Sequence, residues 1–301
     1  MGNQYGVLTE GTVLNYRYFI FEADRFQHCY FHEQYIAFDR VSQKKVRIAE
    51  YFCHENAVRQ PDDTVVPVDA RSFQQGLQWF RKHVRYAAMM PAGMPKLLDR
   101  FQANGTEYAV LEWRDSEWDL VEFMSEFPME FEKIKSIESA LSFLSGAMEE
   151  LSRLHSCGFV FRWLNVNTIH MDPETKRTYL SCFGNVGLYP DTNEDPLEDN
   201  FSEPRRRFQY GCEPGECFTR KKAFGPYSAV YTLCSLLCML VTNTVVPAIP
   251  ERVSDGWSVP TGFFTEPVRR VLNKGLSLRA EDRYQSVEEL RWALLCAMRE
   301  R

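Results

Sequence analysis

The chain has 301 residues, of which 45% are hydrophobic and 25% charged, a composition typical of a globular protein with room for two lobes. Its formal net charge of −6 provides no basic field, which argues against nucleic acid as a partner. Nine cysteines without a framework spacing indicate free thiols in a reducing, cytoplasmic compartment. The longest apolar run, Ala229–Val241, is too short for a membrane span and predicts a buried core helix.

The first third of the chain predicts an antiparallel sheet interrupted by one helix. Aromatic and β-branched residues fill 16–26 and 30–39, and a third strand begins at Val46. Apolar residues at helical spacing predict a helix over Ser72–Val84. The Asn-Gly pair at 104–105 lies between two apolar stretches, which favours a tight hairpin turn because both central residues of such a turn need a positive φ.

From about Trp118 the pattern changes to helices. Apolar residues every three or four positions predict one face of a long helix that ends at Gly158. A short hairpin is expected within 167–183, followed by an irregular acidic segment over 184–204. Ser286 and Glu289 have the spacing of a capping box at the start of the last helix. The apolar face of the long helix comprises Ile137, Leu141, Leu144, Met148, Leu151 and Leu154.

A lone arginine, Arg162, follows the long helix and is flanked by Phe161 and Trp163. The order of a small β portion, one helix, a hairpin, a connector and a helical portion resembles the protein kinases, in particular the bacterial serine/threonine kinases. The resemblance runs from about Gly11 to the end of the chain. The segments that carry it are "VRIAEYF" from Val46, "YAVLEW" from Tyr108, "RLHSCGFVFRWLNVNTIHM" from Arg153, "YLSCFGNVG" from Tyr179, "CEPGECF" from Cys212 and "LSLRAEDRYQSVEELRWAL" from Leu276.

The resemblance implies an α+β, bilobal protein-kinase-like fold. A small antiparallel β lobe with one helix is expected over residues 1–113, and a larger, mainly helical lobe over residues 114–301. In this family phosphoryl transfer depends on charge placed around the triphosphate.

The resemblance also implies that no catalytic residue is intact. Removing a general base alone costs ~10²–10⁴ in rate. Neither tryptophan nor cysteine suits Mg²⁺, which prefers hard oxygen ligands. The degenerate positions are Ala49 for the lysine of the third strand, Gly76 for its glutamate partner, Trp163 for the catalytic aspartate, Thr168 for the metal-binding asparagine and Cys182 for the aspartate of Asp-Phe-Gly.

The cleft that binds nucleotide in the family is also altered, so we expect no cofactor and no metal. Side chains at the three glycine positions obstruct the close approach of backbone to phosphate. Arg47 shares a strand face with Ala49 because side chains alternate, so it either plugs the cleft or holds an anion there. The residues expected to line the cleft are Gln27, Cys29 and His32 at the glycine positions, with Arg47, Leu111 and Trp113.

Three residues are expected to have structural roles. Glu216 matches the glutamate that ends the activation segment, and Arg283 matches the arginine with which it forms a buried ion pair. Arg162 is expected to pair with an acidic side chain of the segment 191–203 or to stack on Trp163. That acidic segment is either a docking surface or a solvated loop. A zinc site is the less favoured interpretation of His28, Cys29, His32, Cys53 and His54.

These observations predict a catalytically inactive, kinase-like domain, a pseudokinase, that binds another protein through its activation-segment face or its cleft face. Two alternatives stay open at this point. One is a divergent kinase-fold phosphotransferase, or another nucleotide-dependent transferase, that uses Arg47, Arg162 and Lys44 or Lys45. The other is a sensor that binds a small ligand in the cleft without a metal.

Overall fold

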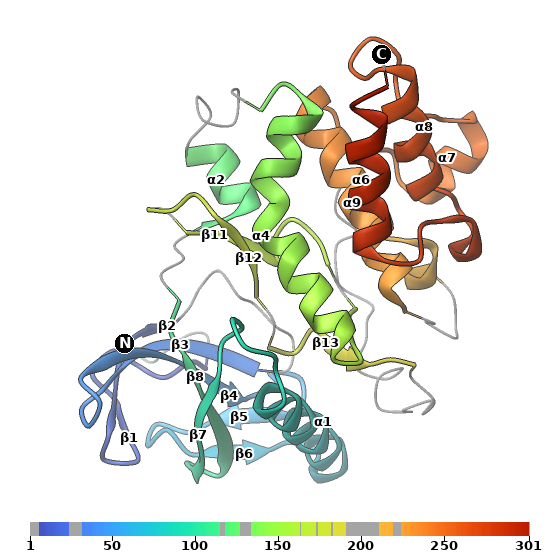
Figure 1. Ribbon diagram of the computed structural model, residues 1–301. Coiled ribbons are helices and arrows are strands. Elements are labelled where there is room, and N and C mark those ends of the chain that lie inside the picture. The colour runs from blue at the N-terminus through green and yellow to red at the C-terminus, as the bar shows by residue number, and fades with distance from the viewer. Residues whose placement is uncertain are drawn as a thin grey trace. The chain divides into compact units, whose positions relative to one another are not determined.

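The structure is a computed structural model that describes residues 6–23, 32–114, 118–126, 134–162, 164–172, 174–181, 183–190, 211–218 and 224–300. These residues belong to two units that divide after Arg114, and each unit has its own core. The first unit holds the sheet and one helix, and the second holds the remaining helices with short strand pairs (Figure 1).

A six-stranded antiparallel sheet forms the first unit, in the order β1-β2-β3-β4-β8-β7. The hairpin turn predicted between the last two strands is confirmed, because Asn104 and Gly105 have φ values of 51° and 72°. The strands of this sheet are β1 (Val13–Leu14), β2 (Tyr18–Ala23), β3 (His32–Asp39), β4 (Lys44–Tyr51), β7 (Leu97–Ala103) and β8 (Thr106–Glu112).

One face of the sheet carries an apolar core that includes Tyr18, Tyr35, Ile48 and Val110. Glu50 of β4 points to this face and is fully buried. Its carboxylate accepts hydrogen bonds of 2.6 Å from the hydroxyls of Tyr35 and Tyr108 and pairs with Arg59 at 2.6 Å. A buried carboxylate needs such compensation, so this cluster ties the segment that carries Arg59 to the sheet.

That segment contains a feature that the sequence analysis did not predict. In the sequence, a two-stranded sheet of β5 (Ala57–Arg59) and β6 (Val65–Pro67) comes between β4 and the helix α1 (Ala70–Ala88). The helix predicted over 72–84 is confirmed and is longer at both ends. It begins after Asp69, whose carboxylate accepts from the backbone N–H of Arg71 at 2.9 Å.

The second unit contains a helix core and three small strand pairings. The buried core helix predicted from the apolar run is confirmed as α6, in which 228–241 are all buried. Among the described residues, no helix is long and apolar enough to cross a membrane. The helices are α2 (Leu120–Glu126), α4 (Ile137–Ser156), α6 (Pro226–Thr242), α7 (Ile249–Asp255), α8 (Glu266–Gly275) and α9 (Val287–Ala297), with the 3-10 turns η1 (Gly215–Phe218) and η2 (Ala280–Asp282).

Short strands pack beside α4, and β12 (Thr178–Leu180) contacts its middle at Phe143 and Ala147. The predicted hairpin is confirmed as β11 (Ile169–Met171) and β12, with β9 (Trp118–Asp119) pairing against β11. The segment from Gly184, expected to be irregular, instead contains β13 (Val186–Leu188), which pairs antiparallel with β10 (Phe159–Phe161). The expectation failed because a three-residue strand depends on its partner rather than on its own sequence.

The predicted capping box of α9 is formed in part. The Ser286 hydroxyl accepts from the backbone N–H of Glu289 at 3.0 Å. The Glu289 carboxylate accepts from the N–H of Gln285 at 2.8 Å, one residue before the expected donor.

Candidate functional site

Ala49, which the sequence analysis matched to the family's strand lysine, lies in the middle of β4. Ala49 is fully buried and lies between Gln34 of β3 and Ala109 of β8. Two residues further along the same strand face, Tyr51 projects toward α1, because side chains alternate along a strand. Its ring is 4.9 Å, centroid to centroid, from that of Phe73. This part of the sheet therefore meets the helix through apolar and aromatic groups.

Gly76, which the sequence analysis matched to the glutamate partner of that lysine, lies on the buried face of α1. The Tyr51 hydroxyl donates to the backbone carbonyl of Phe73 at 2.9 Å, which holds the phenol against the helix. A Cβ added at Gly76 would collide with the Tyr51 Oη and lie 2.9 Å from its Cζ. The Tyr51 phenol therefore occupies the space that a side chain at Gly76 would need.

Three of the residues expected to line a cleft lie together at one end of the sheet. Arg47 of β4 stands opposite Leu111 of β8. The Arg47 guanidinium carbon lies 5.3 Å from the centroid of the Trp113 ring, and the Lys45 ammonium nitrogen lies 5.7 Å from the same ring. Such cation–π contacts stabilise by about 0.5–1 kcal/mol at exposed sites. The contact directs Arg47 toward Trp113 within the first unit.

The remaining expected cleft residues are described in part. His32 is buried at the start of β3, and its Nε2 lies 2.9 Å from the side-chain nitrogen of Gln34. Gln27 and Cys29 lie outside the described residues. Of the other residues of the less favoured zinc interpretation, His54 contacts the Glu33 carboxylate at 2.7 Å, and His28 lies outside the described residues. No group of three or more His, Cys, Asp or Glu side chains suited to a metal occurs in the part of the chain that the structure describes.

In the second unit, Thr168 closes a short turn. Its hydroxyl donates to the backbone carbonyl of Asn165 at 3.0 Å, and it accepts from the N–H of Asn165 at 2.9 Å. The Thr168 carbonyl accepts from the N–H of Ser181 at 2.9 Å. This pattern gives Thr168 a role in loop geometry. Trp163 and Cys182 lie outside the described residues.

Arg162 lies across a neighbouring strand. Its backbone N–H donates to the carbonyl of Asn185 at 2.8 Å. A Cβ added at Gly187, in β13, would collide with the Arg162 guanidinium, so the glycine allows this side chain to lie against the strand backbone. Both expected partners, Trp163 and the segment 191–203, lie outside the described residues.

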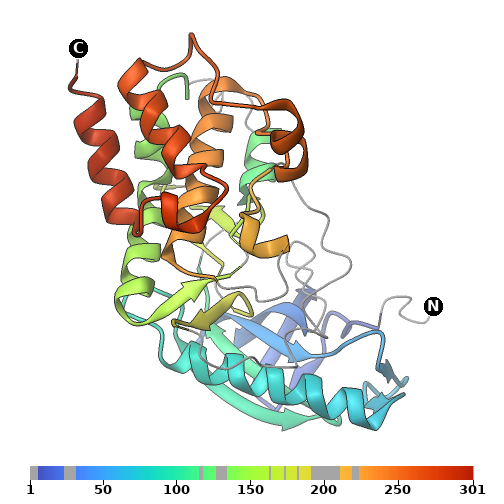
Figure 2. The ribbon, with the colours of Figure 1, turned by 90° about the vertical axis from the view of Figure 1, so that its right-hand side faces the viewer.

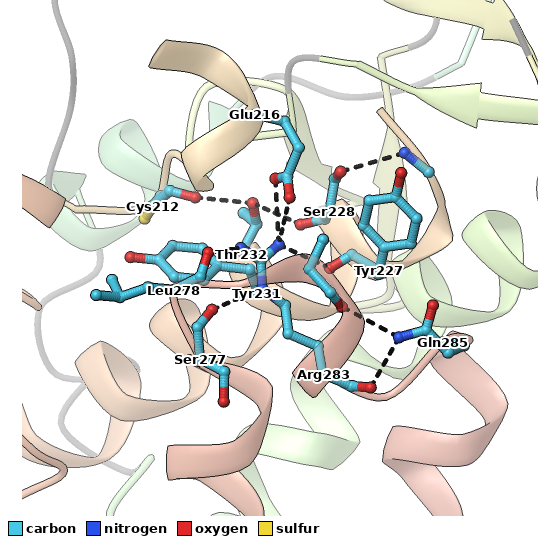
Figure 3. Close-up of polar contacts among 12 residues, drawn as sticks. Cys212, Glu216, Tyr227, Ser228, Tyr231, Thr232, Ser277, Leu278, Arg283 and Gln285 are labelled. Atoms are coloured by element: carbon cyan, nitrogen blue, oxygen red, sulfur yellow. Dashed lines mark hydrogen bonds and ion pairs between the residues drawn. The ribbon is translucent and has the colours of Figure 1, made fainter. Parts of the chain in front are cut away.

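Glu216 and Arg283 form an ion pair inside the second unit (Figure 3). One guanidinium nitrogen lies 3.1 Å from each carboxylate oxygen of Glu216, and the Arg283 side chain is fully buried. The other guanidinium nitrogens donate to the carbonyls of Ser277 and Leu278 at 2.7 and 3.0 Å. The guanidinium carbon also lies 4.9 Å from the centroid of the Tyr231 ring. Every side of the buried cation is compensated.

Hydrogen bonds from α6 hold the residues just before Glu216. The Thr232 hydroxyl donates to the carbonyl of Cys212 at 2.8 Å (Figure 3). The Ser235 hydroxyl donates to the carbonyl of Gly211 at 3.2 Å. The segment 211–218 is therefore fixed to the core of the second unit at several points.

Two of the residues that shape these sites were not singled out from the sequence, namely Tyr51 and Tyr231. Alternation along β4 was a usable signal for Tyr51, since it places that residue on the face of Ala49. No local pattern marked Tyr231, which is one of fourteen buried residues on α6.

Comparison with known proteins supports the fold. No protein-family model and no curated protein sequence matches the chain. Among solved structures, PpkA-294 in its apo form has 22% sequence identity and a TM-score of 0.76, covering 96% of this chain and 99% of that chain. The kinase domain of Mycobacterium tuberculosis PknI has 15% identity and a TM-score of 0.62, covering 97% of this chain and 100% of that chain.

A point mutant of the PknI kinase domain is similar to the same extent, with 14% identity and a TM-score of 0.62. At these identities the likeness defines a fold and not an activity. The chain has a bilobal, α+β, protein-kinase-like fold, as the sequence analysis predicted.

Proposed function

We propose that this protein is a catalytically inactive kinase-fold domain, a pseudokinase, that acts by binding another protein. The observation that carries the proposal is the contact between Tyr51 and Gly76. The Tyr51 phenol occupies the space that a side chain at Gly76 would need, which supports the absence of a lysine–glutamate pair between β4 and α1.

The chemistry of the other replaced positions supports the same proposal. Phosphoryl transfer depends on cations placed around the triphosphate and on a residue that orients the nucleophile. Tryptophan at 163 and cysteine at 182 supply no carboxylate, and the Thr168 hydroxyl is bound within its own turn. No single relocated residue replaces a lysine, a base and two metal ligands together.

The chain retains a segment, 211–218, that is fixed in place by its contacts with the rest of the second unit. The segment 211–218 is fixed by the Glu216–Arg283 pair and by α6, although the groups that such a segment would serve in catalysis have been replaced. A segment that is still held in place, although the catalytic groups beside it in the family have been replaced, favours a role in protein recognition. We assign that recognition to the face of this segment.

Thermal unfolding with ATP in the presence of Mg²⁺, Mn²⁺ or EDTA tests the proposal. A ligand at 100 times its Kd adds ~2.7 kcal/mol to the stability of the folded state, which is a readable shift in Tm. The proposal predicts no shift under any of these conditions. A metal-dependent shift would instead support the divergent transferase, and a metal-independent shift would support the small-ligand sensor.

A further inference from the structure

The charge of helix α1 is opposite to that of the chain as a whole. The chain has a formal net charge of −6, whereas α1 contains arginine and lysine residues and no acidic residue. Figure 2 shows α1, coloured cyan to teal, in front of the strands of the first unit. Its exposed side chains recur every three or four residues, which places them on one face of the helix. This outer face comprises Arg71, Gln74, Gln78, Arg81 and Arg85.

One arginine of this face, Arg81, is already paired. Its Nε lies 3.0 Å from both carboxylate oxygens of Glu107 in β8. The side-chain amide of Gln102, in β7, donates to the same carboxylate at 2.6 Å. Burial acts to raise the pKa of Glu107, but these hydrogen bonds and the charges of Arg81 and Arg100 lower it. The ionised carboxylate therefore joins α1 to both strands.

Two more arginines lie beside this pair. Arg85 follows Arg81 by four residues, which is about one helical turn, or roughly 6 Å along the helix. Arg100 of β7 lies opposite Ala109, and Ala109 lies opposite Ala49, so the Arg100 side chain is on the sheet face that meets α1. Three arginines therefore gather around the single carboxylate of Glu107.

The charges of Arg85 and Arg100 are not balanced. Both residues are exposed, and neither forms an ion pair within the part of the chain that the structure describes. Three guanidiniums against one carboxylate leave an excess of two positive charges at this place. Such a local excess on a chain that is acidic overall attracts a small negatively charged group of a partner.

We propose that Arg81, Arg85 and Arg100, the arginine cluster, form a docking site for an acidic segment of a partner protein. The Arg81–Glu107 pair fixes the helix against the strands, so Arg85 and Arg100 project from a fixed base. The Glu107 pair uses Nε and Nη2 of Arg81, which leaves Nη1 to donate to a partner. Carboxylates four residues apart on a partner helix repeat the spacing of Arg81 and Arg85.

Two other anionic partners fit the arginine cluster less well. A nucleic acid presents a long row of phosphates, which the net charge of −6 repels beyond the cluster. An anionic membrane surface favours a basic helix with an apolar face beside it, whereas Gln74 and Gln78 continue the outer face of α1. A short acidic protein segment meets the arginines without following the rest of the chain.

Fluorescence anisotropy of a labelled helical peptide with glutamate at every fourth position tests the proposal. The full chain should bind this peptide with a Kd on the order of 100 µM, because exposed ion pairs are individually weak. A control peptide with glutamine in place of glutamate should not bind. Raising the salt concentration to about 1 M should abolish binding of the glutamate peptide, because salt screens exposed charges.

Charge reversal locates the site. Arg85→Glu and Arg100→Glu should each weaken binding by at least ~5-fold. Arg291→Glu makes the same change of charge at an exposed position of α9 and should change the Kd by less than ~2-fold. Circular dichroism checks that each variant folds. If a reversed charge beside Glu107 prevents folding, Arg85→Gln and Arg100→Gln decide, because each should weaken binding while adding no negative charge.

Three results would overturn the inference. The first is no binding of the glutamate peptide, and the second is binding that the Arg85 and Arg100 variants leave unchanged. The third is tighter binding of a single-stranded DNA or of anionic lipid vesicles than of the peptide. The inference goes beyond the pseudokinase proposal, and the two can fail separately, because the peptide test involves no nucleotide and the ATP tests involve no peptide.

Discussion

The Tyr51 hydroxyl donates to the Phe73 carbonyl of α1 at 2.9 Å, and its phenol fills the space beside Gly76. We predict that Gly76→Ala destabilises the fold by about 1–3 kcal/mol, because overpacking outweighs the helix preference of alanine, which is worth about 1 kcal/mol. Urea unfolding of the variant and the wild type measures the difference in the free energy of unfolding.

The control for this prediction removes the phenol. In a Tyr51→Leu background, Gly76→Ala should cost little or nothing, because the colliding atoms are gone. An equal cost in both backgrounds would show that another contact, and not Tyr51, excludes the side chain.

The ion pair of the second unit gives the next prediction. Arg283→Leu should destabilise the fold by about 3–5 kcal/mol, since it leaves the Glu216 carboxylate buried without its cation. Replacing both residues by leucine should cost less than the sum of the two single changes. Chemical unfolding of the three variants checks this, and strict additivity would mean that the two charges do not stabilise each other.

The stability of the second unit should depend on pH through the buried imidazole of His155. Burial lowers the pKa of this imidazole to about 4, and neither ring nitrogen has a hydrogen-bond partner within the described residues. Between pH 6.5 and 4 the unfolded chain therefore binds a proton that the folded chain does not. Stability contributed by the neutral ring is present above pH 6.5 and is lost as the pH falls.

From these values His155 should lower the free energy of unfolding by about 2 kcal/mol between pH 7.5 and pH 5. His155→Gln should remove that part of the pH dependence and leave the rest. The measurement is urea unfolding of both proteins at the two pH values. The same slope in both would place the titration elsewhere.

The contact between Arg47 and Trp113 is open to a double-mutant cycle. Arg47→Ala should cost about 0.5–1 kcal/mol more in the wild type than in a protein in which Trp113 is already leucine. Equilibrium unfolding of the four proteins gives the coupling energy. A coupling energy of zero would show that the guanidinium gains nothing from the ring.

Much of the fold follows from local chemistry in the sequence. The Asn-Gly turn, the alternating strands around it and the apolar run of α6 each carry their own signal, and each was confirmed. The hairpin β5–β6 and the strand β13 could not be predicted, because strands of three residues form through partners that the sequence does not reveal.

The sequence predicts which positions belong to the candidate site, but it does not predict how their side chains pack against each other. A motif comparison points to Ala49 and Gly76, and alternation places Tyr51 on the strand face of Ala49. Which residue of α1 meets the phenol depends on how the helix crosses the sheet, and that is a property of the packed unit. The same holds for Arg162, whose position against Gly187 follows from the pairing of β10 with β13.

The central claim is that this kinase fold no longer transfers phosphate, and transfer of the labelled γ-phosphate of ATP tests it most directly. The purified chain, incubated with Mg²⁺ or Mn²⁺ and with itself and a mixed protein substrate as acceptors, is expected to give no transfer and no hydrolysis above the buffer blank. Metal-dependent transfer that disappears in Arg47→Ala or Arg162→Ala would contradict the account, because it would show that the chain had rebuilt the missing charges from these arginines.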